Sequence, residues 1–150
     1  MLKTIDPLLG PELLWVLAAM GHGDDLALVD ANFPAETIAA ATTSQRLVRL
    51  PGLPMARVAE AILSLLPIDD FVQDPVRRME VVGDASAIPE VQREVLAALA
   101  GSGHAAAVAG IERFAFYEAA ARGFAVVQVG DQRPYGCFLL RKGVIAGGKP

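Results

Sequence analysis

Cysteine and histidine are nearly absent: the 150 residues include one cysteine, Cys137, and two histidines. A single cysteine cannot form an intramolecular disulfide, so a reducing cytoplasm is the expected environment. Zinc-type sites need closely spaced Cys and His ligands, and neither His-x-His nor Cys-x-x-Cys occurs. We therefore expect no metal, with His22, Asp24 and Asp30 as the alternative ligand set.

Charge is also scarce, since 20% of residues are charged and the net charge is −4. Basic residues are scattered except for the pairs Arg77-Arg78 and Arg141-Lys142. Because nucleic-acid binding requires clustered Lys and Arg, we expect no nucleic-acid partner. The complete phosphate-loop pattern G-x-x-x-x-G-K-[ST] and the pattern G-x-G-x-x-G are missing too, and no cofactor is expected.

Long apolar runs are missing, although 53% of residues are hydrophobic and the mean hydropathy is +0.41. The longest N-terminal run, 13–20, is too short to cross a bilayer, and it follows Asp6, Pro11 and Glu12 rather than a basic leader. We expect a cytoplasmic protein without a membrane partner. The thin polar surface predicts burial against copies of the same chain.

Apolar segments of helical and strand length alternate along the chain. Prolines at first helical positions and glycines after last ones support helices over 11–20, 54–66, 89–100 and 112–122. Strands are predicted at 26–30, 46–50 and 79–83, followed by an antiparallel pair at 124–130 and 137–143; the run 105–110 fits a strand or a loop. This order predicts a single three-layer α/β/α domain over 1–150 with a mixed sheet of about six strands.

Two polar residues flank the first predicted strand. His22 and the Asp24-Asp25 pair fall in the preceding loop, where the aspartates are expected to be solvated. There, His22 is either a helix-terminal histidine or a proton-transfer group. Asp30 ends an apolar run, and a buried carboxylate requires a partner.

A second polar set lies near the C-terminus, in "ERFAFYE" (112–118) and "RPYGC" (133–137). Taken alone, Tyr117 fits core packing, Arg113 fits a solvated face, and the second stretch fits a hairpin turn. Cys137 is either a small buried apolar residue or a nucleophile paired with His22.

Together these stretches resemble the D-ribose pyranase / L-fucose mutarotase family, and its fucose mutarotase branch in particular. The resemblance rests on "MLKTIDPLLGPELLWVLAAMGHGDDLALVDANFP", "ERFAFYEAAARGFAVVQVGDQRPYG" and "LLRKGVI", while 35–100 matches in pattern only. It implies metal-free interconversion of sugar anomers, or of pyranose and furanose rings. It also implies a ring-shaped homo-oligomer, commonly a decamer, with sites at subunit contacts.

The resemblance also implies roles for individual residues. His22 corresponds to the proton donor, and the sugar-binding positions correspond to Asp30, Arg113, Tyr135, Gly136 and Cys137. The family usually has asparagine at the position of Cys137, and a thiol cannot replace an amide that both donates and accepts. Substrate identity is therefore less defined than reaction class.

The chemistry of ring opening agrees with these residues. A cyclic hemiacetal opens when its ring oxygen gains a proton and its anomeric hydroxyl loses one, and histidine suits one of these transfers. Asp30 would orient the imidazole or hold a hydroxyl, Arg113 would donate to hydroxyls, and Tyr117 or Tyr135 would form an aromatic wall. We expect His22 and Asp30 to act on one small ring from the two ends of one loop. The predicted function is a mutarotase for L-fucose or a related aldose; the alternative is a non-catalytic sugar-binding or regulatory module.

Overall fold

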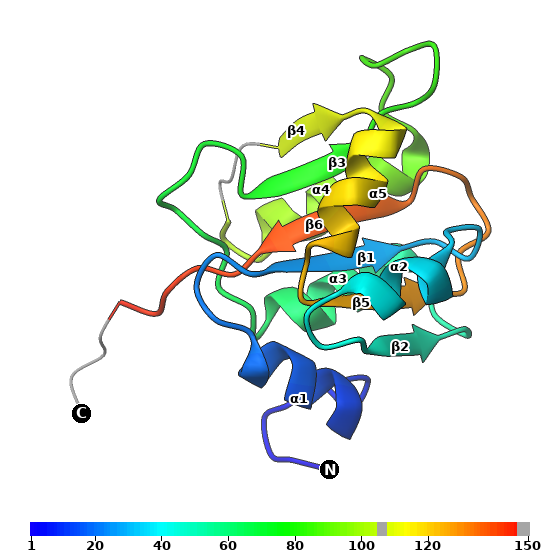
Figure 1. The fold of residues 1–150 in the computed structure, drawn as a ribbon. Coiled ribbons are helices and arrows are strands. Elements are labelled where there is room, and N and C mark those ends of the chain that lie inside the picture. Colours follow the sequence, from blue (N-terminus) through cyan, green and yellow to red (C-terminus); the bar gives the residue numbers. More distant parts are fainter. Residues whose placement is uncertain (105–107, 147–150) are drawn as a thin grey trace.

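Helices and strands alternate through most of the chain (Figure 1). The structure is a computed structural model that describes residues 1–104 and 108–146. The helices are α1 (Pro11–Ala19), α2 (Ala35–Ala41), α3 (Met55–Leu63), α4 (Glu90–Gly101) and α5 (Arg113–Ala121). The strands are β1 (Asp25–Val29), β2 (Leu47–Leu50), β3 (Val76–Met79), β4 (Val108–Ile111), β5 (Ala125–Val129) and β6 (Cys137–Arg141).

All six strands form one mixed sheet in the order β2-β5-β1-β6-β3-β4. β1 pairs parallel with β5, β5 with β2, and β3 with β4, whereas β6 runs antiparallel to both β1 and β3. Five strands therefore point one way and β6 the other, as the arrows in Figure 1 show. Strands β1 to β5 end on the same side of the sheet, where β6 begins. We call this side the carboxyl edge, and we call the opposite side, where these five strands begin, the amino edge.

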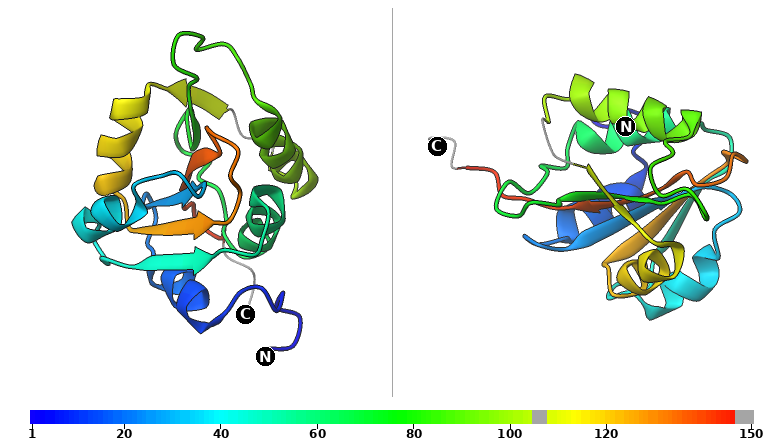
Figure 2. Two further views of the ribbon diagram at one scale, coloured as in Figure 1. Left: turned by 90° about the vertical axis from the view of Figure 1, so that its right-hand side faces the viewer. Right: turned by 90° about the horizontal axis from the view of Figure 1, so that it is seen from above.

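The alternation of side chains along each strand divides the core between the two faces of the sheet. Leu26 and Leu28 of β1 join the core cluster of α1, α3 and α4, whereas Ala27 and Val29 join that of α2 and α5. Figure 2 shows α3 and α4 on one side of the sheet and α2 and α5 on the other. The predicted three-layer α/β/α arrangement with a six-stranded mixed sheet is confirmed.

The predicted antiparallel pairing of 124–130 with 137–143 is wrong. Both segments are strands, but β1 lies between them and pairs with each. The apolar run of β1 is buried on both faces and has two ladder edges to fill, so it takes β5 on one side and β6 on the other. Residues 130–136 cross the end of β1 instead of forming a hairpin turn.

Two further expectations near the middle of the chain are corrected. The strand expected at 79–83 lies at β3 (Val76–Met79), because the guanidinium groups of Arg77 and Arg78 both find partners inside the fold. Helix α2 was not predicted, since its seven residues carry no apolar stripe. Of the ambiguous run 105–110, residues 105–107 lie outside the described residues, and 108–110 belong to β4.

Candidate active site at two edges of the sheet

His22 lies at the amino edge, in the turn between α1 and β1. Its Nε2 is 3.2 Å from Oδ1 of Asp69, and its ring packs on Phe71 with centroids 5.3 Å apart. The side chain of His22 is 46% exposed while that of Asp69 is 2% exposed. A solvent-exposed imidazole is thus hydrogen-bonded to a buried carboxylate.

Asp69 is fixed by the backbone that follows it. The Phe71 N–H donates to its Oδ1 at 3.0 Å, and this bond, followed by the one from His22, lowers the pKa of the Asp69 carboxyl. An ionised carboxylate only accepts hydrogen bonds, so Nε2 of His22 carries a proton and Nδ1 is the nitrogen left for a ligand.

Two interpretations of this loop are corrected. The cation at the end of α1 is Lys142, whose Nζ donates to the carbonyls of Leu17 and Met20 at 2.7 and 2.6 Å. Asp25 is not a solvated loop residue: it starts β1 and forms ion pairs with Arg77 and Arg141. The histidine is therefore not needed to neutralise the helix terminus.

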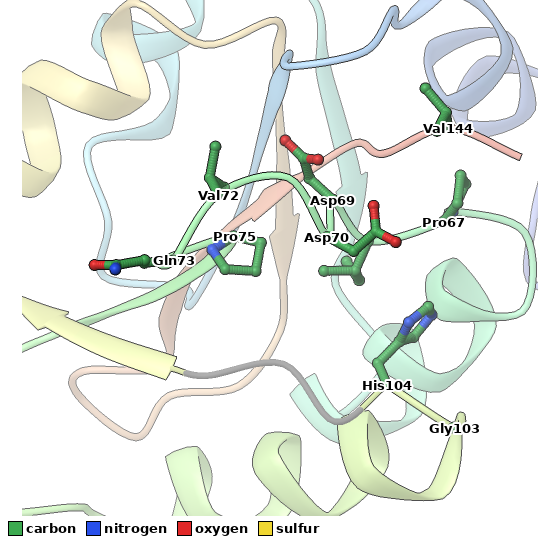
Figure 3. Close-up of a pocket in the computed structure, with 10 residues that line it drawn as sticks. Pro67, Asp69, Asp70, Val72, Gln73, Pro75, Gly103, His104 and Val144 are labelled. Atoms are coloured by element: carbon green, nitrogen blue, oxygen red, sulfur yellow. The ribbon is translucent and has the colours of Figure 1, made fainter. Parts of the chain in front are cut away.

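A pocket of about 550 Å³ opens at the same edge (Figure 3). Asp69, Asp70 and His104 line it, together with Val72 and Val144. Figure 3 shows the two aspartates directed differently, with His104 across the pocket from them. Its volume lies in the range typical of small-molecule sites.

Asp30 lies at the carboxyl edge, directly after β1, and is 2% exposed. Its Oδ1 accepts the Asn32 N–H at 2.8 Å, and the thiol of Cys137 donates to its Oδ2 at 3.5 Å. Burial raises the pKa of the Asp30 carboxyl despite these bonds. The sequence predicts that a buried carboxylate at Asp30 needs a partner, and the thiol of Cys137 is one such partner.

Tyr135, Gly136 and Cys137 lie beside Asp30, since Cys137 pairs with Val29 across β1 and β6. A Cβ at Gly136 would stand 3.3 Å from the Asp30 Cβ, so this position favours glycine. Tyr135 has φ +67°, and its hydroxyl accepts the Val82 N–H at 3.3 Å. Cys137 is buried, as expected of a small apolar residue, and burial raises the pKa of its thiol.

Arg113 and Tyr117 lie one helical turn apart at the start of α5. The N-cap Glu112 accepts the N–H groups of Phe114 and Ala115, while Nε of Arg113 is buried without a hydrogen-bond partner in the described part of the chain. The Tyr117 ring packs edge-on against Phe33, three residues after Asp30, with centroids 5.4 Å apart. This helix start therefore faces the loop that carries Asp30.

The predicted residues thus fall into two groups at opposite edges of the sheet. His22 stands alone at the amino edge, whereas the others lie at the carboxyl edge: Asp30, Arg113, Tyr117, Tyr135, Gly136 and Cys137. The five residues of β1 alone separate His22 from Asp30 by roughly 16 Å, at about 3.3 Å per residue. Within one chain, the expectation that the two work from one loop is wrong, and Asp69 rather than Asp30 orients the imidazole.

Sequence reasoning missed three polar side chains at these edges. Asp69 follows His22 by 47 residues, and no local pattern connects them. The other two, Gln92 and Gln128, donate to carbonyls of the carboxyl-edge loops. A lone glutamine in an otherwise apolar stripe, as in "EVQREVL", is the only signal that could have indicated Gln92.

Neither a metal cluster nor a membrane span is found within 1–104 and 108–146. Among these residues no three His, Cys, Asp or Glu side chains are grouped to hold a metal ion. The helices that they form are also too short or too polar to cross a bilayer.

Residues 3–145 match the family model described as the RbsD / FucU transport protein family. The chain belongs to this family. The human fucose mutarotase is 43% identical over 148 residues, which cover 97% of this chain and 95% of the relative. The L-fucose mutarotase of Actinobacillus pleuropneumoniae is 41% identical, with 96% and 97% covered.

A solved structure of the family is close as well. The fucose mutarotase of Streptococcus pneumoniae, crystallised with L-fucose, superposes with a TM-score of 0.86 at 31% identity, covering 97% of this chain and 100% of that one. The family predicted from the sequence is therefore confirmed.

Proposed function

We propose that this protein is a sugar mutarotase that interconverts the α and β anomers of L-fucose or a closely related aldose. The observation that carries the proposal is the exposed imidazole of His22 held by the buried Asp69 carboxylate at 3.2 Å. Such a pair suits proton transfer to a small ligand and needs no bound cofactor. The similarity to fucose mutarotases supports the choice of sugar.

The reaction begins with proton transfer to the ring oxygen. Protonated His22 donates from Nδ1, while the anomeric hydroxyl loses its proton to a carboxylate, for which Asp30 is the candidate. The bond between the anomeric carbon and the ring oxygen breaks as a carbonyl forms, giving the open-chain aldehyde. Rotation of this carbonyl followed by the reverse transfers closes either anomer, so the protein is regenerated unchanged.

Such a site needs both edges of the sheet, and we propose that two subunits supply them. The amino edge of one copy would bring His22 and Asp69 against the carboxyl edge of the next, which carries Asp30 and Tyr135. Both edges expose apolar side chains suited to contact: Phe71 and Ile145 on the amino edge are 70% and 80% exposed, and Val82 and Phe114 on the carboxyl edge are 62% and 60% exposed.

A contact between two different edges is heterologous, and repeated copies form a closed ring where the rotation between neighbours closes. The family resemblance implies a decamer, and the single buried cysteine agrees with the cytoplasm as its location.

The test is saturation-transfer NMR on a panel of aldoses. Irradiating one anomeric proton of L-fucose should reduce the signal of the other in the presence of the protein, because the two anomers exchange. Sugar binding without such transfer would favour the alternative, a non-catalytic binding module. Saturation transfer observed only with a different aldose would support the mutarotase reaction and identify that aldose as the substrate.

A further inference from the structure

The backbone at the carboxyl edge contains one uncommon conformation. Tyr135 has φ +67°, in the left-handed region that residues with a side chain rarely adopt. Such a conformation persists only where its surroundings fix it, and it often marks a functional position. The contacts of Tyr135 therefore indicate what holds the loop in place.

Gln92 of α4 is the buried residue that fixes the Tyr135 carbonyl. Its side chain is fully buried, and its Nε2 donates to the Tyr135 carbonyl at 2.8 Å and to the Met79 carbonyl at 2.7 Å. Its Oε1 accepts from Nη1 of Arg78 at 3.3 Å. The amide thus joins the end of β3 to the loop before β6 and uses both of its donor hydrogens.

Arg78 fixes the amide in turn. This guanidinium is 8% exposed and also donates to the carbonyls of Ala85 and Ala87, at 3.0 and 3.2 Å. Because Oε1 faces Arg78, Nε2 must face the two carbonyls. The orientation of Gln92 is therefore determined by the fold rather than by a ligand.

The loop that contains Tyr135 and Gly136 connects Gln92 to the Asp30 carboxylate. Gly136 follows Tyr135, and a Cβ there would stand 3.2 Å from Cγ2 of Val91 and 3.3 Å from the Cβ of Asp30. With so little clearance, a displaced Tyr135 carbonyl would move Gly136 against Asp30. On the other side of Asp30, Nε2 of Gln128 donates to the Asp30 and Phe33 carbonyls, both at 3.2 Å.

We propose that Gln92 is a positioning residue for the sugar: it fixes the left-handed Tyr135 and, through Gly136, the place of Asp30. The inference rests on the proposed function of the carboxyl edge. Gln92 does not touch the ligand; it acts through the Tyr135 carbonyl. Its amide donors, rather than its volume, are what the site requires.

Gln92→Glu tests this because it keeps the shape and the acceptor toward Arg78 but removes both donors. A carboxylate oxygen would then face the Tyr135 and Met79 carbonyls. We expect KM for the sugar to rise about tenfold or more, as for a lost hydrogen bond in a buried network, and kcat to fall as well, because Asp30 is also the candidate proton acceptor. Gln45→Glu, the same change on an exposed residue, should leave both constants unchanged.

A sugar-independent measurement separates this inference from the proposed function. Amide hydrogen exchange at Gly136 should be faster in Gln92→Glu than in the unmodified protein, with or without sugar. Gln92→Asn keeps an uncharged amide but is one methylene shorter, so it should show the same faster exchange even where the glutamate variant folds poorly.

Unchanged KM together with unchanged exchange at Gly136 would overturn the positioning role. A protein that fails to interconvert any sugar, yet shows faster Gly136 exchange in both variants, would overturn the proposed function while retaining the role of Gln92 in holding the loop.

Discussion

The carboxyl group of Asp30 lies in a place unfavourable for a charge. It is 2% exposed, and its described side-chain partners are an amide N–H and a thiol rather than a cation. A buried carboxylate without a counter-charge lowers the stability of the fold unless it serves another purpose. Binding a polyhydroxylated ligand is such a purpose, because sugar hydroxyls would donate the missing hydrogen bonds.

Asp30→Asn should therefore stabilise the protein near neutral pH while weakening sugar binding about tenfold or more. Burial raises the pKa of Asp30 above its usual 3.8, so the folded state holds its proton over a range where the unfolded chain has released it. Stability due to this group consequently falls as pH rises through that range. The thermal midpoints of both proteins, measured from about pH 4 to 7, should diverge in favour of the variant. A variant less stable than the unmodified protein at neutral pH would contradict the argument.

Cys137 meets Asp30 through its thiol, at 3.5 Å, and is almost inaccessible. In Cys137→Asn, an amide would give Asp30 a stronger donor and leave a carbonyl for the sugar. We expect L-fucose to bind a few-fold and up to about tenfold more tightly, since a neutral hydrogen bond contributes about 0.5–1.5 kcal/mol. The affinities of a panel of aldoses and the thermal midpoint provide the measurement.

The opposite result would be informative for substrate choice. Weaker L-fucose binding by Cys137→Asn, with another aldose preferred by the unmodified protein, would show that the cysteine selects that other sugar. The L-fucose assignment would then be wrong, and the mutarotase reaction would remain.

For individual residues, the sequence predicted which side chains belong to the candidate site better than it predicted which of them contact one another. The proximity of Tyr135, Gly136 and Cys137 to Asp30 follows from the pairing of β6 with β1, which no local pattern specifies. Likewise, Asp69 reaches His22 only because β1 and β3 both begin at the amino edge. Long-range pairing decided these contacts.

Among the helices and strands, α1 is capped at its C-terminal end by a cation, Lys142, which directly follows β6. The Lys142 ammonium donates to two carbonyls of the last turn, those of Leu17 and Met20. A cation at this position also complements the partial negative charge of the helix terminus. It fixes the helix against the end of β6, next to the turn that carries His22.

Lys142→Met should reduce the stability by about 1–2 kcal/mol, because two carbonyls lose a charged donor. For a chain of this size the thermal midpoint should fall by about 2–8 °C. Lys3→Met, the same change on an exposed lysine, should have little effect. Equal midpoints for the two variants would show that the cap contributes nothing measurable.

Element prediction succeeded where one segment contains its own signal. Helices with proline at the start and glycine beyond the end were placed within a few residues, α1 and α4 among them. It failed where tertiary partners decide. β3 contains two arginines that only become compatible with a buried strand through Asp25, Gln92 and loop carbonyls. The separation of β5 from β6 likewise depends on β1 rather than on the connecting residues.

For the whole molecule, the separation of His22 from Asp30 has a testable consequence. Each proposed site combines the amino edge of one subunit with the carboxyl edge of its neighbour. His22→Ala and Asp30→Asn should each be inactive alone. After dissociation and reassembly as an equal mixture, about one quarter of the sites should combine two intact edges, and about a quarter of the activity should return.

The control is each variant carried through the same dissociation and reassembly by itself, which should remain inactive. A mixture that stays inactive although its subunits have exchanged would show that both residues act within one chain, and the composite site would be wrong.

In the proposed reaction His22 transfers a proton during anomer interconversion, and the exchange rate of the L-fucose anomers measures this step. The unmodified protein should produce saturation transfer between the two anomeric protons. His22→Ala of unchanged oligomer size should be slower by about 10²–10⁴-fold, the usual contribution of general acid–base catalysis, and free imidazole should restore part of the rate. A correctly assembled His22→Ala protein that exchanges the anomers at the full rate would show that His22 does not transfer the proton.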